Sequence, residues 1–147
     1  MKDVRIVGET MQFKNVQLTK VKAVHGSKRP CGDACGYIFR APGEKTLYLA
    51  GDTVWCNEVK ETIEKFRPEV IISYSCAAVL QDYGRLIMDD NDLYELYKAA
   101  PEATIIASHM DNVPHATLTR KTLREKLAKK GILSKILIPD DGESYTL

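Results

Sequence analysis

The sequence predicts an α/β fold in which helices cover one face of a mixed β-sheet. Strand patterns fill most of the first 50 residues, where a Pro-Gly turn at 42–45 joins two of them. From residue 57 onward, amphipathic helical segments alternate with short apolar runs rich in β-branched residues, as expected of buried strands. A hairpin followed by helix–strand alternation indicates helices packed over a sheet.

The first part of the chain is predicted to form strands. Residues 4–7 make a short strand, and residues 15–24 alternate polar and apolar side chains, as a half-buried strand does. A loop rich in glycine and small residues follows, and then strands at 37–41 and 46–50 form the hairpin. The predicted strands and hairpin thus precede every predicted helix.

The rest of the chain is predicted to alternate helices with strands. In the helix at 57–66, apolar residues recur at spacings of four and three, Asn57 is the N-cap, and Pro68 lies just past the end. The remaining elements are helices at 89–100 and 117–131, buried strands at 69–75 and 103–109, and closing strands at 135–139 and 144–147. No repeat or linker interrupts the 147 residues, so we expect a single domain over 1–147.

The composition is that of an ordinary soluble globular protein, with 44% hydrophobic and 28% charged residues. A formal net charge of +1 gives no electrostatic reason to expect a nucleic acid or an anionic membrane as partner. The first ten residues lack the apolar core of a secretory signal, and no segment approaches the roughly 18 apolar residues of a membrane span. With four cysteines, reduced thiols and a cytoplasmic location are the expectation.

Three polar side chains stand where predicted strands end. His25 follows "VKAV", Asp52 follows "TLYLA" after one glycine, and His109 closes "ATIIASH". Loops that leave the carboxyl ends of strands are where ligands usually bind, and imidazole and carboxylate suit zinc, manganese or iron. Taken singly, a histidine there is often structural, and an aspartate after glycine often only forms a turn. The three together favour a metal site.

The stretches "QLTKVKAVHGS", "GYIFRAPGEKTLYLAGDT" and "TIIASHMDNVPHAT" resemble the metallo-β-lactamase-fold metal-dependent hydrolases, and most of all their L-ascorbate-6-phosphate lactonase-like branch. The resemblance extends from about residue 4 to residue 147 and includes the ending "IPDDGESYTL". It implies an αββα sandwich as the fold. It also implies hydrolysis of a small-molecule substrate by water that a di-metal centre of zinc or manganese activates.

The same resemblance implies a role for each candidate residue. Asp52 would be the catalytic carboxylate that bridges the two metal ions, and His25 and His109 would each bind one of them. His115, in the loop beyond His109, would be an extra ligand or a substrate contact. Tyr74 is a second candidate for contact with the substrate.

The chain departs from the family pattern because it lacks the early H-x-H-x-D-H motif; its first histidine is His25. It therefore resembles only the C-terminal portion of the αββα sandwich, and each metal would have two protein ligands where catalytic zinc normally has three. We expect a truncated or incomplete hydrolase with reduced or no activity alone. Three explanations stay open: a fragment, one half of a split enzyme, and a shortened homologue without catalysis. Thiolates from Cys31 and Cys35 could complete zinc coordination.

Two other classes of function compete with the hydrolase. A haloacid-dehalogenase-like phosphatase also places an acidic residue after a glycine at a strand end, but its early D-x-D motif has no counterpart after the first predicted strand. A non-catalytic α/β module would act through association with other chains. Because half of a two-sheet sandwich would expose apolar strand faces, a homo-oligomer or a complementing chain is the expected partner.

Overall fold

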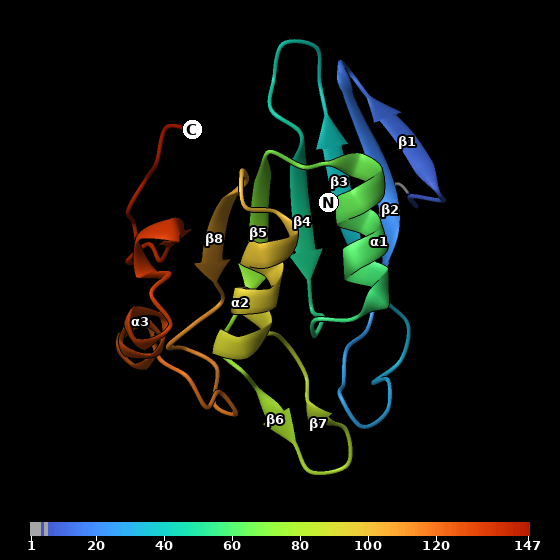
Figure 1. The fold of residues 1–147 in the computed structure, drawn as a ribbon. Helices are drawn as coiled ribbons and strands as arrows, with labels where there is room; N and C mark the ends of the chain where they lie inside the picture. The colour runs from blue at the N-terminus through green and yellow to red at the C-terminus, as the bar shows by residue number, and fades with distance from the viewer. Residues whose placement is uncertain (1–3, 5) are drawn as a thin grey trace.

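A twisted sheet runs through the centre of this computed structural model, which describes residues 4 and 6–147 (Figure 1). Among those residues the sheet has seven strands in the order β1-β2-β3-β4-β5-β8-β9, and β6 and β7 form a separate hairpin. The strands are β1 (Thr10–Phe13), β2 (Val16–Ala23), β3 (Ala34–Arg40), β4 (Leu47–Gly51), β5 (Val70–Tyr74), β6 (Val79–Leu80), β7 (Gly84–Arg85), β8 (Thr104–Ser108) and β9 (Ile136–Leu137).

The directions of the strands bring the ends of four of them to one edge of the sheet. β1 to β4 pair antiparallel in sequence order, whereas β4, β5, β8 and β9 pair parallel. It follows that β2, β4, β5 and β8 all run in the same direction. Their carboxyl ends meet at what we call the carboxyl edge, which lies at the bottom of the sheet in Figure 1, beside the β6–β7 hairpin.

The helices are α1 (Asn57–Phe66), α2 (Asp90–Ala99) and α3 (Arg120–Lys129), followed by the short 3₁₀ helix η1 (Leu133–Lys135). α1 and α2 lie on the same face of the sheet (Figure 1). The Asp89 carboxylate caps α2 by accepting from two backbone N–H groups, and Thr119 caps α3 through a capping box. None of the helices in the described part of the chain is long and apolar enough to span a membrane.

The two faces of the sheet differ in burial. Tyr48, Ile71 and Ile105 point toward the helices and are fully buried. Their neighbours along the strands point to the opposite face and are only half-buried, although most are large and apolar. This set, here called the open face, comprises Tyr37, Phe39, Leu47, Leu49, Ile72, Tyr74 and Ile106. Both faces of the sheet therefore carry mainly apolar side chains, as expected of a sheet that is covered on both faces.

The mixed sheet, the helices on one of its faces and the β3–β4 hairpin confirm the predicted mixed α/β arrangement, whereas its assignment to the C-terminal portion of an αββα sandwich stays a prediction. Two predicted strands are wrong: residues 4, 6 and 7 form no strand, residue 5 lies outside the described residues, and 144–147 is irregular. Three strands were missed, namely β1 and the two strands of the β6–β7 hairpin. A strand of two residues is too short to show any periodicity, so the β6–β7 hairpin left no pattern to detect.

Candidate functional site

The carboxyl edge brings two of the predicted metal ligands into one cavity. His25 follows β2 and Asp52 follows β4, and both line a cavity of about 310 Å³. The other lining residues are Cys31, Asp33, Ala34, Cys35, Tyr37, Leu49, Gly51 and Tyr74. The two residues meet because β2 and β4 run in the same direction, so the loops that follow these strands lie at the same edge.

Asp52 is aimed by an irregularity at the end of β4. The β4–β5 register shifts between Leu49 and Gly51, and Gly51 has a φ of 69°, in the left-handed region that glycine enters without a steric penalty. Bulges of this kind re-aim a side chain at the rim of a sheet. The Asp52 carboxylate is consequently exposed at the edge, as a ligand or a catalytic group needs to be.

Thr53 joins the loop that carries Asp52 to the loop that carries His25. The fully buried Thr53 hydroxyl accepts from the backbone N–H of Val24 at 3.0 Å and donates to the carbonyl of Val54 at 2.9 Å. The N–H of Val54 in turn donates to the carbonyl of Val24 at 2.9 Å. Val24 precedes His25 and Thr53 follows Asp52, so these bonds fix the two candidate ligands relative to each other.

The imidazole of His25 is held in one orientation. Its Nδ1 lies 3.1 Å from the carbonyl oxygen of Leu86. A carbonyl only accepts hydrogen bonds, so Nδ1 carries the proton and the lone pair of neutral His25 lies on Nε2. Metal-binding histidines commonly have this arrangement, with one ring nitrogen donating to a backbone carbonyl and the other facing the metal. The geometry of His25 therefore suits a ligand.

His109 lies next to the cavity without lining it. Its ring stacks on Tyr74, with centroids 4.6 Å apart and planes 29° from parallel, and Tyr74 does line the cavity. His109 also has a φ of 61°, and Ala77 and Asp111 nearby have φ values of 49° and 68°. Residues other than glycine pay a free-energy penalty in this left-handed region, and such residues cluster at functional sites. Tyr74 thus connects the third predicted ligand to the first two.

His115 is exposed in the loop between β8 and α3. Its carbonyl accepts from the backbone N–H of Val79 at 3.0 Å, which ties this loop to the β6–β7 hairpin. The His115 side chain does not line the cavity that His25 and Asp52 share. Its role as an extra ligand or substrate contact stays a prediction.

The four cysteines divide into two pairs. Cys31 and Cys35 line the cavity, and the Cys35 thiol donates to the Tyr37 hydroxyl at 3.5 Å, a contact that raises the pKa of Tyr37. Cys56 lies at the start of α1, Cys76 is fully buried after β5, and burial raises the pKa of both thiols. Cys56 and Cys76 are therefore packing residues, whereas the first pair faces the site.

Taken alone, the chain brings together an incomplete set of metal donors. Within the residues that the structure describes, no group of three or more His, Cys, Asp or Glu side chains is arranged to hold a metal ion. The donor types at the carboxyl edge suit a divalent metal, but catalytic sites normally have at least three protein ligands. The described residues consequently do not form a complete metal centre by themselves.

Several residues that shape the site left no signal in the sequence. The Leu86 carbonyl that orients His25 belongs to the segment after β7. Tyr74 was expected only as a substrate contact, and its stacking on His109 across neighbouring strands was not foreseen. Arg85 and Asp92 form a partly buried ion pair behind the same loops. Only Thr53 could have been recognised, as the last residue of the "GDT" turn.

In a comparison with known proteins, no family model matches the chain. Over 99% of its length it is 43% identical to the UPF0173 protein YddR of Bacillus subtilis, of which it covers 59%. It is 26% identical, over 96% of its length, to a UPF0173 metal-dependent hydrolase of Korarchaeum cryptofilum and again covers 59% of that protein. The chain thus spans about three-fifths of the length of these relatives.

The chain is also similar in structure to solved proteins that are longer than it. The chain matches an isothiocyanate hydrolase from Delia radicum gut bacteria with a TM-score of 0.89 and 37% identity, covering 97% of this chain and 59% of that one. It matches the metallo-β-lactamase-fold protein YhfI of Bacillus subtilis with a TM-score of 0.63 and 14% identity, covering 93% and 52%. The second likeness shows the fold alone. The chain is thus similar in sequence to UPF0173 proteins, among them metal-dependent hydrolases, and similar in fold to a metallo-β-lactamase-fold protein.

Proposed function

We propose that this chain contributes part of the divalent-metal site of a hydrolase of the UPF0173 type, through His25, Asp52 and His109. The observation that carries the proposal is the convergence of His25 and Asp52 on one cavity, with the Nε2 lone pair of His25 free to bind. A metal bound there would acidify a water molecule and so supply the nucleophile for hydrolysis. Zinc and manganese both suit imidazole and carboxylate donors.

The cavity favours a small neutral substrate. Asp33 and Asp52 both line it, and none of its described lining residues is a lysine or an arginine. A phosphorylated lactone, the substrate class of the L-ascorbate-6-phosphate lactonase-like branch, would meet two carboxylates and no cationic side chain of this cavity. An isothiocyanate carries no charge, and a relative that hydrolyses one is 37% identical to this chain. We therefore propose an isothiocyanate, R–N=C=S, as the substrate class.

An assay of amine release tests this substrate class. Hydrolysis of an isothiocyanate gives the amine RNH₂ and carbonyl sulfide, so the amine is the quantity to measure, with Zn²⁺ or Mn²⁺ present. With the missing donors supplied by the complementing chain described below, we expect turnover that a chelator abolishes and that Asp52→Asn lowers at least tenfold; Asp82→Asn, at an exposed carboxylate in the β6–β7 hairpin, should keep it. Turnover unchanged by Asp52→Asn would contradict the proposal, as would faster hydrolysis of a lactone phosphate.

We further propose that the remaining donors come from polypeptide outside these 147 residues. The open face supports this, because large apolar side chains such as Leu49, Ile72 and Ile106 lie next to one another across β4, β5 and β8 and are only half-buried. A contiguous exposed apolar patch marks a surface that another protein segment covers. The relatives, which are longer, have chain available for that purpose.

Mixing experiments separate a complementing chain from self-association. The part of the Bacillus subtilis relative that lies outside the matched region would be produced as a separate chain and mixed with this one. We expect a one-to-one complex with amine-releasing activity, and loss of the complex with Ile72→Lys on the open face. Glu64→Lys, on the exposed side of α1, is the control and should leave the complex intact. A stable dimer of this chain that ignores the added segment would favour the homo-oligomer.

A further inference from the structure

We propose that the ion pair between Arg85 and Asp92 is a positioning element, which holds the loops that carry His25 and Asp52 in one arrangement. The role rests on the metal site proposed above, because it concerns residues that orient the donors of that site. Neither residue lines the cavity. Their effect would be exerted through hydrogen bonds to the backbone around the two donors.

The pair is bidentate and largely shielded from water. Asp92 lies in the first turn of α2, and its side chain is 11% exposed against 24% for Arg85. The two terminal nitrogens of the guanidinium donate to the two carboxylate oxygens, with Nη2 to Oδ1 at 3.0 Å. A bidentate pair of this kind restricts geometry in a way that a single contact does not. The pair therefore fixes β7 relative to α2.

One connection runs from Asp92 to the loop that carries Asp52. The Oδ2 atom of Asp92 accepts a further hydrogen bond from the backbone N–H of Trp55 at 2.9 Å. Trp55 belongs to the segment between Asp52 and α1, and Thr53 in the same segment holds the loop that carries His25. The Asp92 carboxylate is thus the point at which α2 holds the Asp52 loop.

A second connection runs from Arg85 to His25. The backbone of Arg85 exchanges bonds with Ser27: the Ser27 N–H donates to the Arg85 carbonyl at 2.8 Å, and the Arg85 N–H donates to the Ser27 hydroxyl at 2.8 Å. The Arg85 side chain also donates to the carbonyl of Ile87 at 2.8 Å. Leu86 lies between these two anchored residues, and its carbonyl accepts from Nδ1 of His25.

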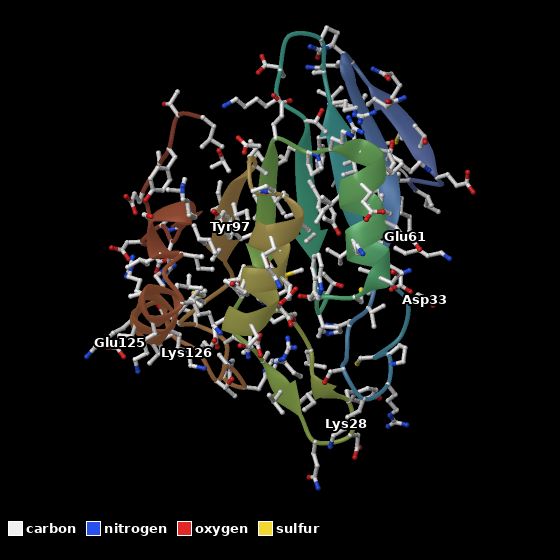
Figure 2. The ribbon with its side chains drawn as sticks, in the orientation of Figure 1. Lys28, Asp33, Glu61, Tyr97, Glu125 and Lys126 are labelled. Carbon is white, nitrogen blue, oxygen red and sulfur yellow. The ribbon has the colours of Figure 1, made fainter. Side chains whose placement is uncertain are left out.

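The surrounding contacts reinforce the same connection. Figure 2 shows Lys28 beside the β6–β7 hairpin, and its backbone N–H donates to the Tyr83 carbonyl at 3.0 Å. The Arg29 guanidinium lies over the Tyr83 ring, 4.6 Å from its centroid. The loop after His25 and the hairpin therefore form one unit. The ion pair joins that unit to α2 and to the Asp52 loop.

The tautomer of His25 is the quantity that tests this role. In metal-free protein above the ordinary imidazole pKa, long-range ¹⁵N–¹H NMR distinguishes a ring protonated at Nδ1 from one protonated at Nε2. The chain has three histidines, so single His→Gln variants assign the signals. We expect one His25 tautomer with the proton on Nδ1 in the parent, and a mixture of both tautomers in Arg85→Met and in Asp92→Asn.

The ion pair between Asp90 and Lys126 is a matched control. Asp90 also lies in the first turn of α2 and is 7% exposed, and Lys126 of α3, labelled in Figure 2, contacts it at 2.7 Å. This pair joins two helices and does not contact the loops of the site. We expect Asp90→Asn to lower the unfolding temperature and to leave the His25 tautomer unchanged.

A single Nδ1-protonated tautomer that persists in folded Arg85→Met or Asp92→Asn would overturn the positioning role. An equal change of tautomer in Asp90→Asn would also overturn it, because the effect would then be general destabilisation. Where Arg85→Met does not fold, Arg85→Lys replaces it, since lysine keeps the charge but loses the bidentate geometry. A parallel Zn²⁺ titration of the chain mixed with the complementing segment separates the two hypotheses: absence of binding counts against the metal site, whereas the tautomer reports on positioning alone.

Discussion

The two edges of the sheet differ in where their residues with left-handed φ values lie. Each edge has to join strands to helices or to neighbouring strands, and each contains residues other than glycine with left-handed φ values. At the edge opposite the site, Arg67 and Lys14 have φ values of 46° and 53°. Arg67 is the C-cap of α1 and Lys14 lies in the β1–β2 turn, positions where this conformation is usual.

At the carboxyl edge the left-handed residues have no such explanation. Ala77, His109 and Asp111 follow β5 and β8, and none of them is the N-cap or C-cap residue of a helix or part of a two-residue hairpin turn. They accompany a register shift in β4 and hydrogen bonds that run from loop to loop. The difference indicates that the loops at the opposite edge only connect helices and strands. The loops at the carboxyl edge also hold particular side chains in fixed positions.

Breaking the bond between loops at Thr53 should have the largest effect on stability. Thr53→Val keeps the shape of the buried side chain but leaves the part-buried N–H of Val24 without its acceptor. We expect a loss of about 1–3 kcal/mol in the free energy of unfolding, measured by chemical denaturation. Thr10→Val on the exposed surface of β1 is the control and should stay within about 0.5 kcal/mol of the parent. Equal stability of the two variants would show that the Thr53 hydroxyl does not connect the loops.

A pair of glycine substitutions compares the two edges directly. Ala77→Gly and Arg67→Gly both relieve a left-handed conformation, and glycine's extra freedom in the unfolded chain offsets part of the gain. We expect Arg67→Gly to raise the free energy of unfolding by about 1 kcal/mol or less, measured by denaturation, and Ala77→Gly to raise it less because it also removes a buried methyl group. Only Ala77→Gly should also weaken metal binding. If Arg67→Gly weakened it equally, strain at the carboxyl edge would have no special role.

The smallest expected effect concerns acid stability. The Arg120 N–H donates to the Asp111 carboxylate and the guanidinium lies beside it, and together they lower the pKa of Asp111. The folded state therefore binds fewer protons than the unfolded chain near and below the ordinary pKa of about 4. The stabilisation is complete above that pH and is lost as the pH falls through the folded pKa.

Denaturation at pH 7 and at pH 3 measures that contribution. Asp111→Asn should be less stable than the parent at pH 7, and the difference should shrink at pH 3. Asp82→Asn, in the exposed β6–β7 hairpin, should follow the parent at both values. A difference between Asp111→Asn and the parent that stays the same at both pH values would mean that the Asp111 contact is not electrostatic.

The sequence predicted those parts of the molecule that local patterns determine. The apolar stripe at 57–66 gave the bounds of α1, although the N-cap is Cys56 and not Asn57. His25 and Asp52 were expected directly after strands, and they do follow β2 and β4 and line one cavity, whereas their role as metal ligands stays a prediction. Such features depend on a few neighbouring residues or on chain topology.

The sequence failed where a structure depends on distant partners. For the strand expected at 4–7, the described residues 4, 6 and 7 pair with no strand in the described part of the chain, and Val4 and Ile6 are 74% and 96% exposed. The stacking of His109 on Tyr74 and the hydrogen bond from the Trp55 N–H to the Asp92 carboxylate join segments more than 30 residues apart. No local pattern encodes such pairs, so only the folded chain reveals how the candidate site is held together.

Paramagnetic broadening by Mn²⁺ most directly tests whether His25, Asp52 and His109 contribute to one metal site. Substoichiometric Mn²⁺ broadens the amide signals of nearby residues even when binding is weak. We predict that the signals of these three residues broaden together, and that Asp52→Asn abolishes the effect while Asp82→Asn preserves it. Broadening centred on other acidic residues, such as the Asp89–Asp90 end of α2, would contradict the proposed site, as would broadening that survives Asp52→Asn.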